Sequence, residues 1–174
     1  MQRISVIGAT GSGKTTVARR TAEALGVPHI ELDALHWEPD WEEAPLEVFR
    51  ERVSDAIQGE RWVVDGNYGK VRDMVWGRAD TVLWLDYPFF GSFLRLLWRT
   101  LRRVVVRERL WNDNRESLTM MFSRDSILLW AITSHPSYRK EYPQLMSDTE
   151  YTHVQFLRHG SPRETEEWLR SLRP

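Results

Sequence analysis

The sequence predicts an α/β fold in which a parallel β-sheet is covered by helices on both faces. Two observations support this prediction. Five short apolar segments alternate with longer segments of helical spacing, which is typical of parallel strands joined by crossover helices. The first apolar segment, 4–7, leads directly into residues 8–15, Gly-Ala-Thr-Gly-Ser-Gly-Lys-Thr, which match the pattern G-x-x-x-x-G-K-[ST]. A chain of 174 residues is expected to form one domain with a core of its own.

The elements are expected in a regular order. Strand 4–7 precedes a helix at 16–25, which Gly26 and Pro28 terminate. Further strands are predicted at 29–32, 62–64, 81–85 and 153–157, and further helices at 46–57, 89–110, 126–133 and 162–172, the last with Ser161 as its N-cap. Asp33, Asp65 and Asp86 each follow a strand. Because ligands of parallel sheets bind at the carboxyl ends of the strands, a site is expected there.

The glycine-rich segment predicts a phosphate-binding loop, or P-loop. Its glycines let the backbone wrap a triphosphate, and the following helix directs its positive N-terminus at the same anion. Lys14 is expected to reach the β- and γ-phosphates, and the Thr15 hydroxyl is expected to bind Mg²⁺. The chain has 21 Arg and only three Lys, so a lysine at this position does not reflect a basic composition. The predicted ATP-binding residues are Gly8, Ala9, Thr10, Gly11, Ser12, Gly13, Lys14, Thr15 and Thr16.

Composition and missing motifs exclude several classes of protein. The net charge is −1, so no global field attracts nucleic acid. There is no cysteine for disulfides or thiolate zinc sites, and no apolar run approaches the ~20 residues that span a bilayer. The first strand begins at residue 2 and leaves no room for a signal peptide, so a cytoplasmic location without a membrane partner is expected. The dinucleotide pattern G-x-G-x-x-G after the first strand and the guanine-specific pattern [NT]-K-x-D are absent.

Four segments together resemble the adenylate-kinase-like P-loop kinases. They are the P-loop, LDALHW at 32–37, VDGNY at 64–68, and the arginine-rich stretch that follows Asp86-Tyr87-Pro88. The resemblance covers about residues 1–170 and is strongest to the group labelled DNA topology modulation protein, of the FlaR type. It implies a P-loop NTPase three-layer sandwich with a five-stranded sheet in the order 2-3-1-4-5. It also implies one kinase domain, 1–174, with an acceptor-binding segment at 34–60 and a helical, arginine-rich lid at 89–125.

The implied strand order gives two aspartates distinct expected roles. Asp65 would lie one strand away from Thr15, where a carboxylate holds Mg²⁺, usually through water. Asp33 would lie one strand further out, beyond the γ-phosphate, where it can accept a proton from a substrate hydroxyl or orient that hydroxyl. Each could instead cap a turn after its strand. Asp86 lies on the other side of the P-loop strand and is more simply read as a helix cap.

Seven arginines lie between residues 95 and 115, against two acidic residues. Arg95, Arg99, Arg103 and Arg107 recur every four residues and so share a helix face. Like charges on one face repel unless an anion pairs with them, and phosphates do so well. Lids of adenylate-kinase-like proteins carry an R-x-x-x-R pair, which Arg99 and Arg103 match best. Both are predicted to be catalytic, with Arg99 also on the nucleotide and Arg107 on the substrate.

The same arginines permit two other interpretations. They could form a solvated basic face, or a nucleic-acid surface on which Trp98 and Trp111 stack on bases. The helix is also rich in leucine and valine, which indicates that it packs on the protein along much of its length. A nucleic-acid partner is therefore not expected.

The segment 34–60 is predicted to bind the phosphoryl acceptor. Trp37 could floor an apolar pocket, and Phe49-Arg50 resembles the Phe-Arg pair with which shikimate-kinase-like proteins hold an anionic substrate. His159, after the last strand, matches the position where such folds contact the adenine edge. These features predict an ATP- and Mg²⁺-dependent kinase of a small hydroxyl- or phosphate-bearing acceptor. The alternative is an ATP-binding regulatory protein that acts on DNA or a protein partner. The sequence leaves the oligomeric state open.

Overall fold

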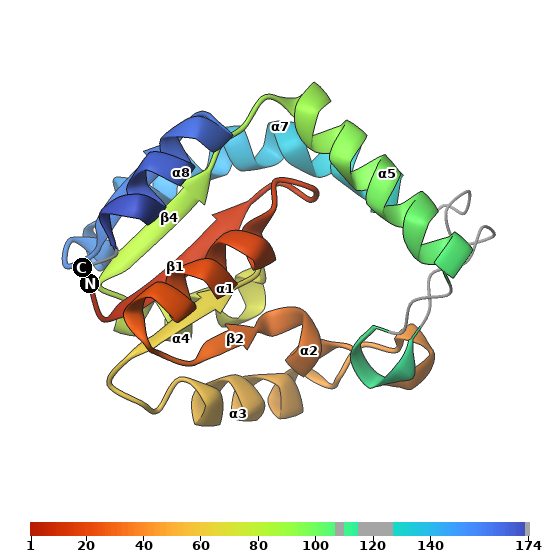
Figure 1. Ribbon diagram of the computed structural model, residues 1–174. Helices are drawn as coiled ribbons and strands as arrows, with labels where there is room; N and C mark the ends of the chain where they lie inside the picture. Colours follow the sequence, from red (N-terminus) through yellow and green to blue (C-terminus); the bar gives the residue numbers. More distant parts are fainter. Residues whose placement is uncertain (107–109, 115–126, 173–174) are drawn as a thin grey trace.

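The computed structural model describes residues 1–106, 110–114 and 127–172. Its sheet is parallel throughout, with the strand order β2-β3-β1-β4-β5, which confirms the predicted fold class and order. The strands are β1 (Arg3–Gly8), β2 (His29–Glu31), β3 (Trp62–Asp65), β4 (Thr81–Leu85) and β5 (Gln155–His159). Strand β1 is central, so the P-loop at its carboxyl end lies between the ends of β3 and β4 (Figure 1).

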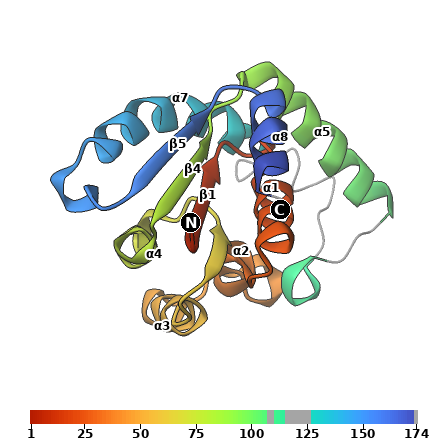
Figure 2. The ribbon, with the colours of Figure 1, turned by 60° about the vertical axis from the view of Figure 1, so that its left-hand side comes forward.

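Helices cover both faces of this sheet. Helices α1 (Lys14–Leu25) and α8 (Pro162–Ser171) lie on one face, where Ile4 and Val6 of β1 pack in the core. Helices α3 (Leu46–Ala56), α4 (Arg72–Arg78) and α7 (Ile127–Met146) lie on the other face (Figure 2). Successive residues of a strand point to opposite faces, and here both faces are covered by helices. The central strands are therefore apolar almost without interruption. Trp62 and Trp84 belong to this core and are fully buried.

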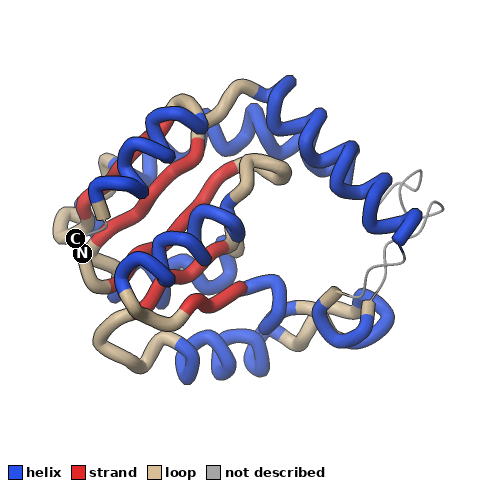
Figure 3. The backbone as a smooth tube through the Cα atoms, in the orientation of Figure 1, coloured by secondary structure: helices blue, strands red, loops and turns tan. Residues whose placement is uncertain are grey.

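The remaining elements surround the carboxyl ends of the strands or connect the layers (Figure 3). Helix α2 (Leu32–His36) follows β2 directly, and the long α5 (Phe89–Val106) follows β4. Short 3₁₀ turns are formed by η1 (Pro39–Trp41), η2 (Gly69–Val71), η3 (Trp111–Asp113) and η4 (Thr149–Tyr151). In the part of the chain that the structure describes, no helix combines the length and apolar character needed to cross a membrane.

Several elements differ from the sequence-based expectation. The last strand covers Gln155–His159 rather than 153–157, because Gln155 pairs with Thr81 at the start of β4. Helix α7 has 20 residues and contains Pro136 and Pro143, which normally interrupt a helix. Helices α2 and α4 were not expected. The helix predicted at 89–110 ends at Val106 within the described residues, and Leu110 lies outside it.

Candidate active site

The P-loop takes a shape that its glycines make possible. Gly11 and Gly13 have φ of 81° and 93°, a region that favours glycine. Gly13 also caps α1, whose first hydrogen bond after the loop runs from Val17 N to the Gly13 carbonyl at 3.0 Å. Gly11 is crowded, since an added Cβ would lie 2.3 Å from the Ser92 carbonyl oxygen of α5. The loop and the N-terminus of α1 thus form the kind of backbone cradle that binds phosphate.

Lys14 lies among charged groups from three elements. Burial lowers the pKa of its ammonium group from the usual value. The carboxylates of Asp33 and Asp65 oppose this shift, and the guanidinium of Arg99 adds to it. These interactions place Lys14 at the point where the P-loop, the two aspartates and α5 come together. An anion bound there would stabilise its charged form.

Thr15 and Asp65 form the most direct link between the P-loop and a neighbouring strand. The Thr15 hydroxyl donates to Asp65 Oδ2 at 2.7 Å. Mg²⁺ takes oxygen ligands, keeps several waters, and binds through one or two protein groups together with phosphate oxygens. A hydroxyl and a buried carboxylate in contact beside a P-loop fit that requirement.

Two residues that the sequence analysis did not single out hold these groups in place. His29 Nε2 lies 2.8 Å from Asp65 Oδ1, so both carboxylate oxygens have partners. The side-chain amide of Asn67 donates to the Gly8 carbonyl at 2.6 Å, and its oxygen accepts from Gly8 N at 3.1 Å. Asn67 thereby ties the end of β3 to the start of the P-loop.

Asp33 is held on the far side of this cluster by an aromatic group. The Tyr68 hydroxyl donates to Asp33 Oδ1 at 2.6 Å. The Tyr68 ring packs against His36, with centroids 4.6 Å apart, and against the buried Phe49 at 5.2 Å. Burial raises the pKa of Tyr68, so the hydroxyl remains a donor to the carboxylate. The packing fixes the direction of that hydrogen bond.

Helix α5 packs directly on the P-loop and brings arginines with it. Arg95 Nε donates to the Gly11 carbonyl at 3.2 Å, and its guanidinium lies over the Tyr87 ring. Arg99 interacts electrostatically with Lys14. Arg103 is partly buried one turn further along. Arg107, the predicted substrate residue, lies outside the described residues.

Of three other predicted residues, Arg50 and His159 lie apart from this cluster, whereas Trp37 interacts with Tyr68, the partner of Asp33. Arg50 is engaged elsewhere, since its Nη2 lies 2.7 Å from Asp73 Oδ2. Trp37 packs against Trp41, with centroids 5.6 Å apart. The ring of His159 is buried against α8, where Nδ1 lies 3.0 Å from the Thr165 hydroxyl.

Asp86 is the centre of a separate ion-pair cluster at the other side of the P-loop. Its buried carboxylate accepts from Arg139 Nε at 2.7 Å and from Arg158 Nε at 3.0 Å. Arg158 also lies over the Trp84 ring, 4.7 Å from its centroid. These contacts join α7 and β5 to the end of β4, so this aspartate has a structural partner on each side.

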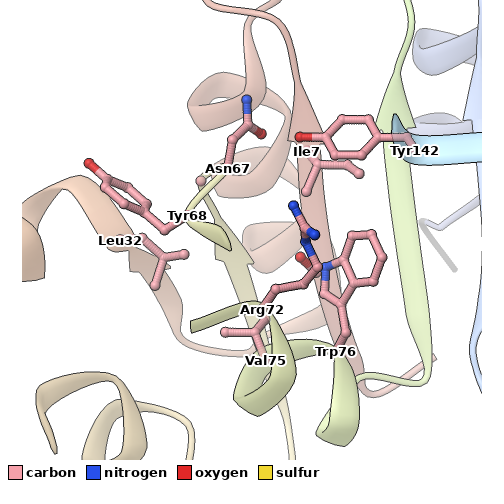
Figure 4. A pocket seen from close by; sticks show the side chains of 10 residues that line it. Ile7, Leu32, Asn67, Tyr68, Arg72, Val75, Trp76 and Tyr142 are labelled. Atoms are coloured by element: carbon pink, nitrogen blue, oxygen red, sulfur yellow. The ribbon is translucent and has the colours of Figure 1, made fainter. Parts of the chain in front are cut away.

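A small pocket lies under the loop that follows β3 (Figure 4). Asn67 and Tyr68 of that loop, Arg72 and Trp76 of α4, and Tyr142 of α7 line it. The Arg72 guanidinium is paired with Glu141 at 2.6 Å and lies over the Trp76 ring. Its charge is therefore already balanced within the fold.

Comparison with solved structures agrees with this fold. A shikimate kinase from Bacteroides thetaiotaomicron is similar at a TM-score of 0.52 and 18% identity, over 98% of this chain and 96% of that one. A gluconokinase from Sinorhizobium meliloti 1021 is similar at a TM-score of 0.54 and 20% identity, over 98% and 93%. The chain has the P-loop kinase fold. At these identities the likeness shows the fold and not the substrate.

No protein-family model matches the sequence, and a search of the curated proteins finds no match. The narrower resemblance to the FlaR-type group is not confirmed and stays a prediction.

Proposed function

We propose that this protein is a kinase that transfers a phosphoryl group from ATP, with Mg²⁺, to a small acceptor bearing a hydroxyl or phosphate group. The observation that carries the proposal is the convergence of Lys14, the Thr15–Asp65 pair and Asp33 at one edge of the sheet. The likeness in fold to two small-molecule kinases supports it. An ATP-binding regulator would need the P-loop but not a carboxylate on the acceptor side.

The mechanism assigns each group a part in in-line transfer. The P-loop amides and Lys14 bind the triphosphate and stabilise negative charge on the β- and γ-oxygens. Thr15 and Asp65 would hold Mg²⁺, which neutralises charge on the phosphates when it is bound. Asp33 takes the proton of the acceptor hydroxyl while the oxygen of that hydroxyl bonds to the γ-phosphorus. The bond from that phosphorus to the β–γ bridging oxygen breaks, and ADP leaves.

The arginines of α5 would act on the transferring group. Arg99, which already interacts with Lys14, would contact the nucleotide phosphates, and Arg103 would stabilise charge that develops during transfer. Residues 34–60 would bind the acceptor, with Trp37 as a wall. Arg50 would have to leave Asp73 to reach an anionic acceptor, so this residue is the weakest part of the predicted acceptor site. A cytoplasmic location also remains part of the proposal.

The test combines ATP binding with a substrate screen. Millimolar ATP and Mg²⁺ should raise the melting temperature, since a ligand that binds only the folded state stabilises it, and Lys14→Ala should remove most of that shift. ADP release should then be measured with nucleosides, nucleoside monophosphates and hydroxylated metabolites. Asp33→Asn should keep the ATP-induced shift but lower turnover with the best hydroxyl acceptor by roughly 10²–10⁴-fold.

Two outcomes would contradict the proposal. Absence of any ATP-induced shift would remove the nucleotide site. A normal shift with no acceptor-dependent ADP release would favour the ATP-binding regulator.

A further inference from the structure

The outer surface of α5 and α7 is unusually apolar. Of the eleven large hydrophobic side chains that are exposed among the described residues, nine lie on these two helices. On α5 they include Phe90, Trp98 and Val105, which are 71%, 73% and 81% exposed. The full set is Phe90, Leu94, Trp98, Leu101, Val105, Val106, Leu129, Trp130 and Ile132, and we call it the α5–α7 face.

Helix α5 exposes one strongly apolar side. The residues that it buries are Ser92, Leu96 and Thr100, which follow one another at intervals of four and include two hydroxyls. Phe90, Leu94, Trp98, Leu101 and Val105 lie on the opposite side. A surface helix normally buries its apolar stripe and exposes its polar one. The arrangement indicates that a second surface covers the outer side.

The two helices lie against each other, and both carry exposed apolar side chains. The rings of Phe89 and His135 meet edge to face with centroids 5.2 Å apart. From their exposed fractions, the nine side chains present on the order of 1,000 Å² of apolar surface, whereas monomers rarely expose more than a few hundred. Stable complexes bury about 800 Å² on each partner, so the face is large enough for a protein interface.

We propose that this protein forms a symmetric dimer in which the α5–α7 faces of two copies pack together. The face carries two tryptophans and a phenylalanine, and neither α5 nor residues 127–138 contain Asp, Glu or Lys. Interface cores are enriched in aromatic residues and depleted in these charged ones. Since a two-fold axis brings the same patch of both copies together, α5 and α7 would form a four-helix contact.

The positions of the arginines favour a protein partner over an anionic membrane. A helix that lies on such a membrane directs its basic residues toward the lipid headgroups. Here Arg95, although exposed, donates to the Gly11 carbonyl, and Arg99 interacts with Lys14, so both are engaged at the P-loop. The side of α5 that packs on the P-loop is opposite to the α5–α7 face, so a dimer of this kind leaves the nucleotide site accessible.

The test compares two leucines of similar exposure. Leu94 on the face and Leu46 at the start of α3 are 46% and 50% exposed, so neither substitution should prevent folding. In sedimentation equilibrium the natural chain should have twice the mass of one chain. Leu94→Glu should weaken association at least about tenfold, because it places an unpaired charge at the interface. Leu46→Glu should leave association unchanged, and far-UV circular dichroism should show both variants folded.

A cross-linking experiment provides a second measurement. The natural chain has no cysteine, so Leu101→Cys introduces one thiol on the face and Leu46→Cys introduces one elsewhere. A short bis-maleimide should trap a covalent dimer of the first variant and not of the second. A monomeric natural chain at about 100 μM, above the dissociation constants of most specific dimers, would overturn the proposal. Equal association of Leu94→Glu, or flotation of a monomer with anionic vesicles, would also overturn it.

Discussion

At the scale of single residues, Gly11 and Gly13 separate backbone strain from crowding. Both adopt left-handed backbone, but an added Cβ meets the Ser92 carbonyl at Gly11 and nothing within 4 Å at Gly13. Gly13→Ala should therefore lower the free energy of unfolding by about 1 kcal/mol, from strain alone. Gly11→Ala should lower it by at least about 2 kcal/mol, since α5 must also move. Urea unfolding without nucleotide measures both, and equal losses would show that α5 does not press on the loop.

Tyr68 is predicted to keep Asp33 in position for its proposed role. Tyr68→Phe keeps the ring that packs on His36 and Phe49 and removes the hydroxyl that donates to Asp33. Hydrogen bonds to charged groups contribute about 1.5–3 kcal/mol, so turnover should fall roughly tenfold or more. The ATP-induced rise in melting temperature should be unchanged.

The matched control for Tyr68 is Tyr151→Phe. Tyr151 is also buried but lies in η4, before the amino end of β5. Its substitution should leave turnover unchanged. A similar loss of turnover in both variants would indicate a general effect of removing a buried hydroxyl.

Among the residues of the site, some could be predicted from the sequence and others could not. Thr15 and Asp65 were expected near each other because β1, which leads into the P-loop, and β3, which ends at Asp65, are neighbours in the strand order that the resemblance implies. The Thr15 hydroxyl and the Asp65 carboxylate are indeed in contact. The contact of His29 with Asp65 depends on how two short strands pair, which no local pattern encodes. Arg50 was assigned from a two-residue resemblance, and such a short match carries no information about a competing partner like Asp73.

At the scale of elements, the role of α5 is tested by its arginines. If α5 acts as a lid, Arg103→Ala should lower the rate of phosphoryl transfer by roughly 10²-fold or more, with little change in ATP affinity, because the charge acts mainly on the transition state. DNA binding should be weak and indifferent to the substitution. Arg102→Ala, at an exposed neighbouring position, is the control and should leave transfer unchanged.

The nucleic-acid interpretation makes the opposite prediction for the same helix. Neutralising Arg95, Arg99 and Arg103 together should then reduce the salt dependence of DNA binding by about one unit of slope for each lost phosphate contact. Turnover should barely change. Lost DNA binding with unchanged turnover would reject the lid.

Two of the elements that were misjudged share a physical cause. Strand β5 and helix α7 have boundaries set by tertiary pairing, since Gln155 aligns with Thr81 and α7 continues through two prolines. Helix α4 is short and lies between two buried strands. Strands β1, β3 and β4 were placed well because both of their faces are buried, which makes the apolar run itself the signal.

At the scale of the whole molecule, two histidines should make stability depend on pH. Burial lowers the pKa of both His36 and His159 below the usual value of 6.5. Near pH 6.5 the unfolded chain therefore binds more protons than the folded one, and stability falls as the pH drops below that value. Each histidine can contribute at most about 1.4 kcal/mol per pH unit.

Urea unfolding between pH 7.5 and 5 measures this dependence. His36→Gln and His159→Gln should each reduce the slope, and the double variant should reduce it most. An unchanged slope in the double variant would show that other groups cause the loss.

The central place of β1 also affects how the chain acquires its structure during synthesis. Its two neighbours are β3 and β4. Val6 therefore has no partner on one side until Asp65 has been synthesised, and no partner on the other side until Leu83 has been synthesised. A nascent chain carries the complete P-loop from the start, but that loop lacks support until β4 has left the ribosome. Non-local pairing of this kind is slow and leaves apolar strands exposed in the meantime. Fragments that end before Thr81 should accordingly bind no ATP, although every P-loop residue is present in them.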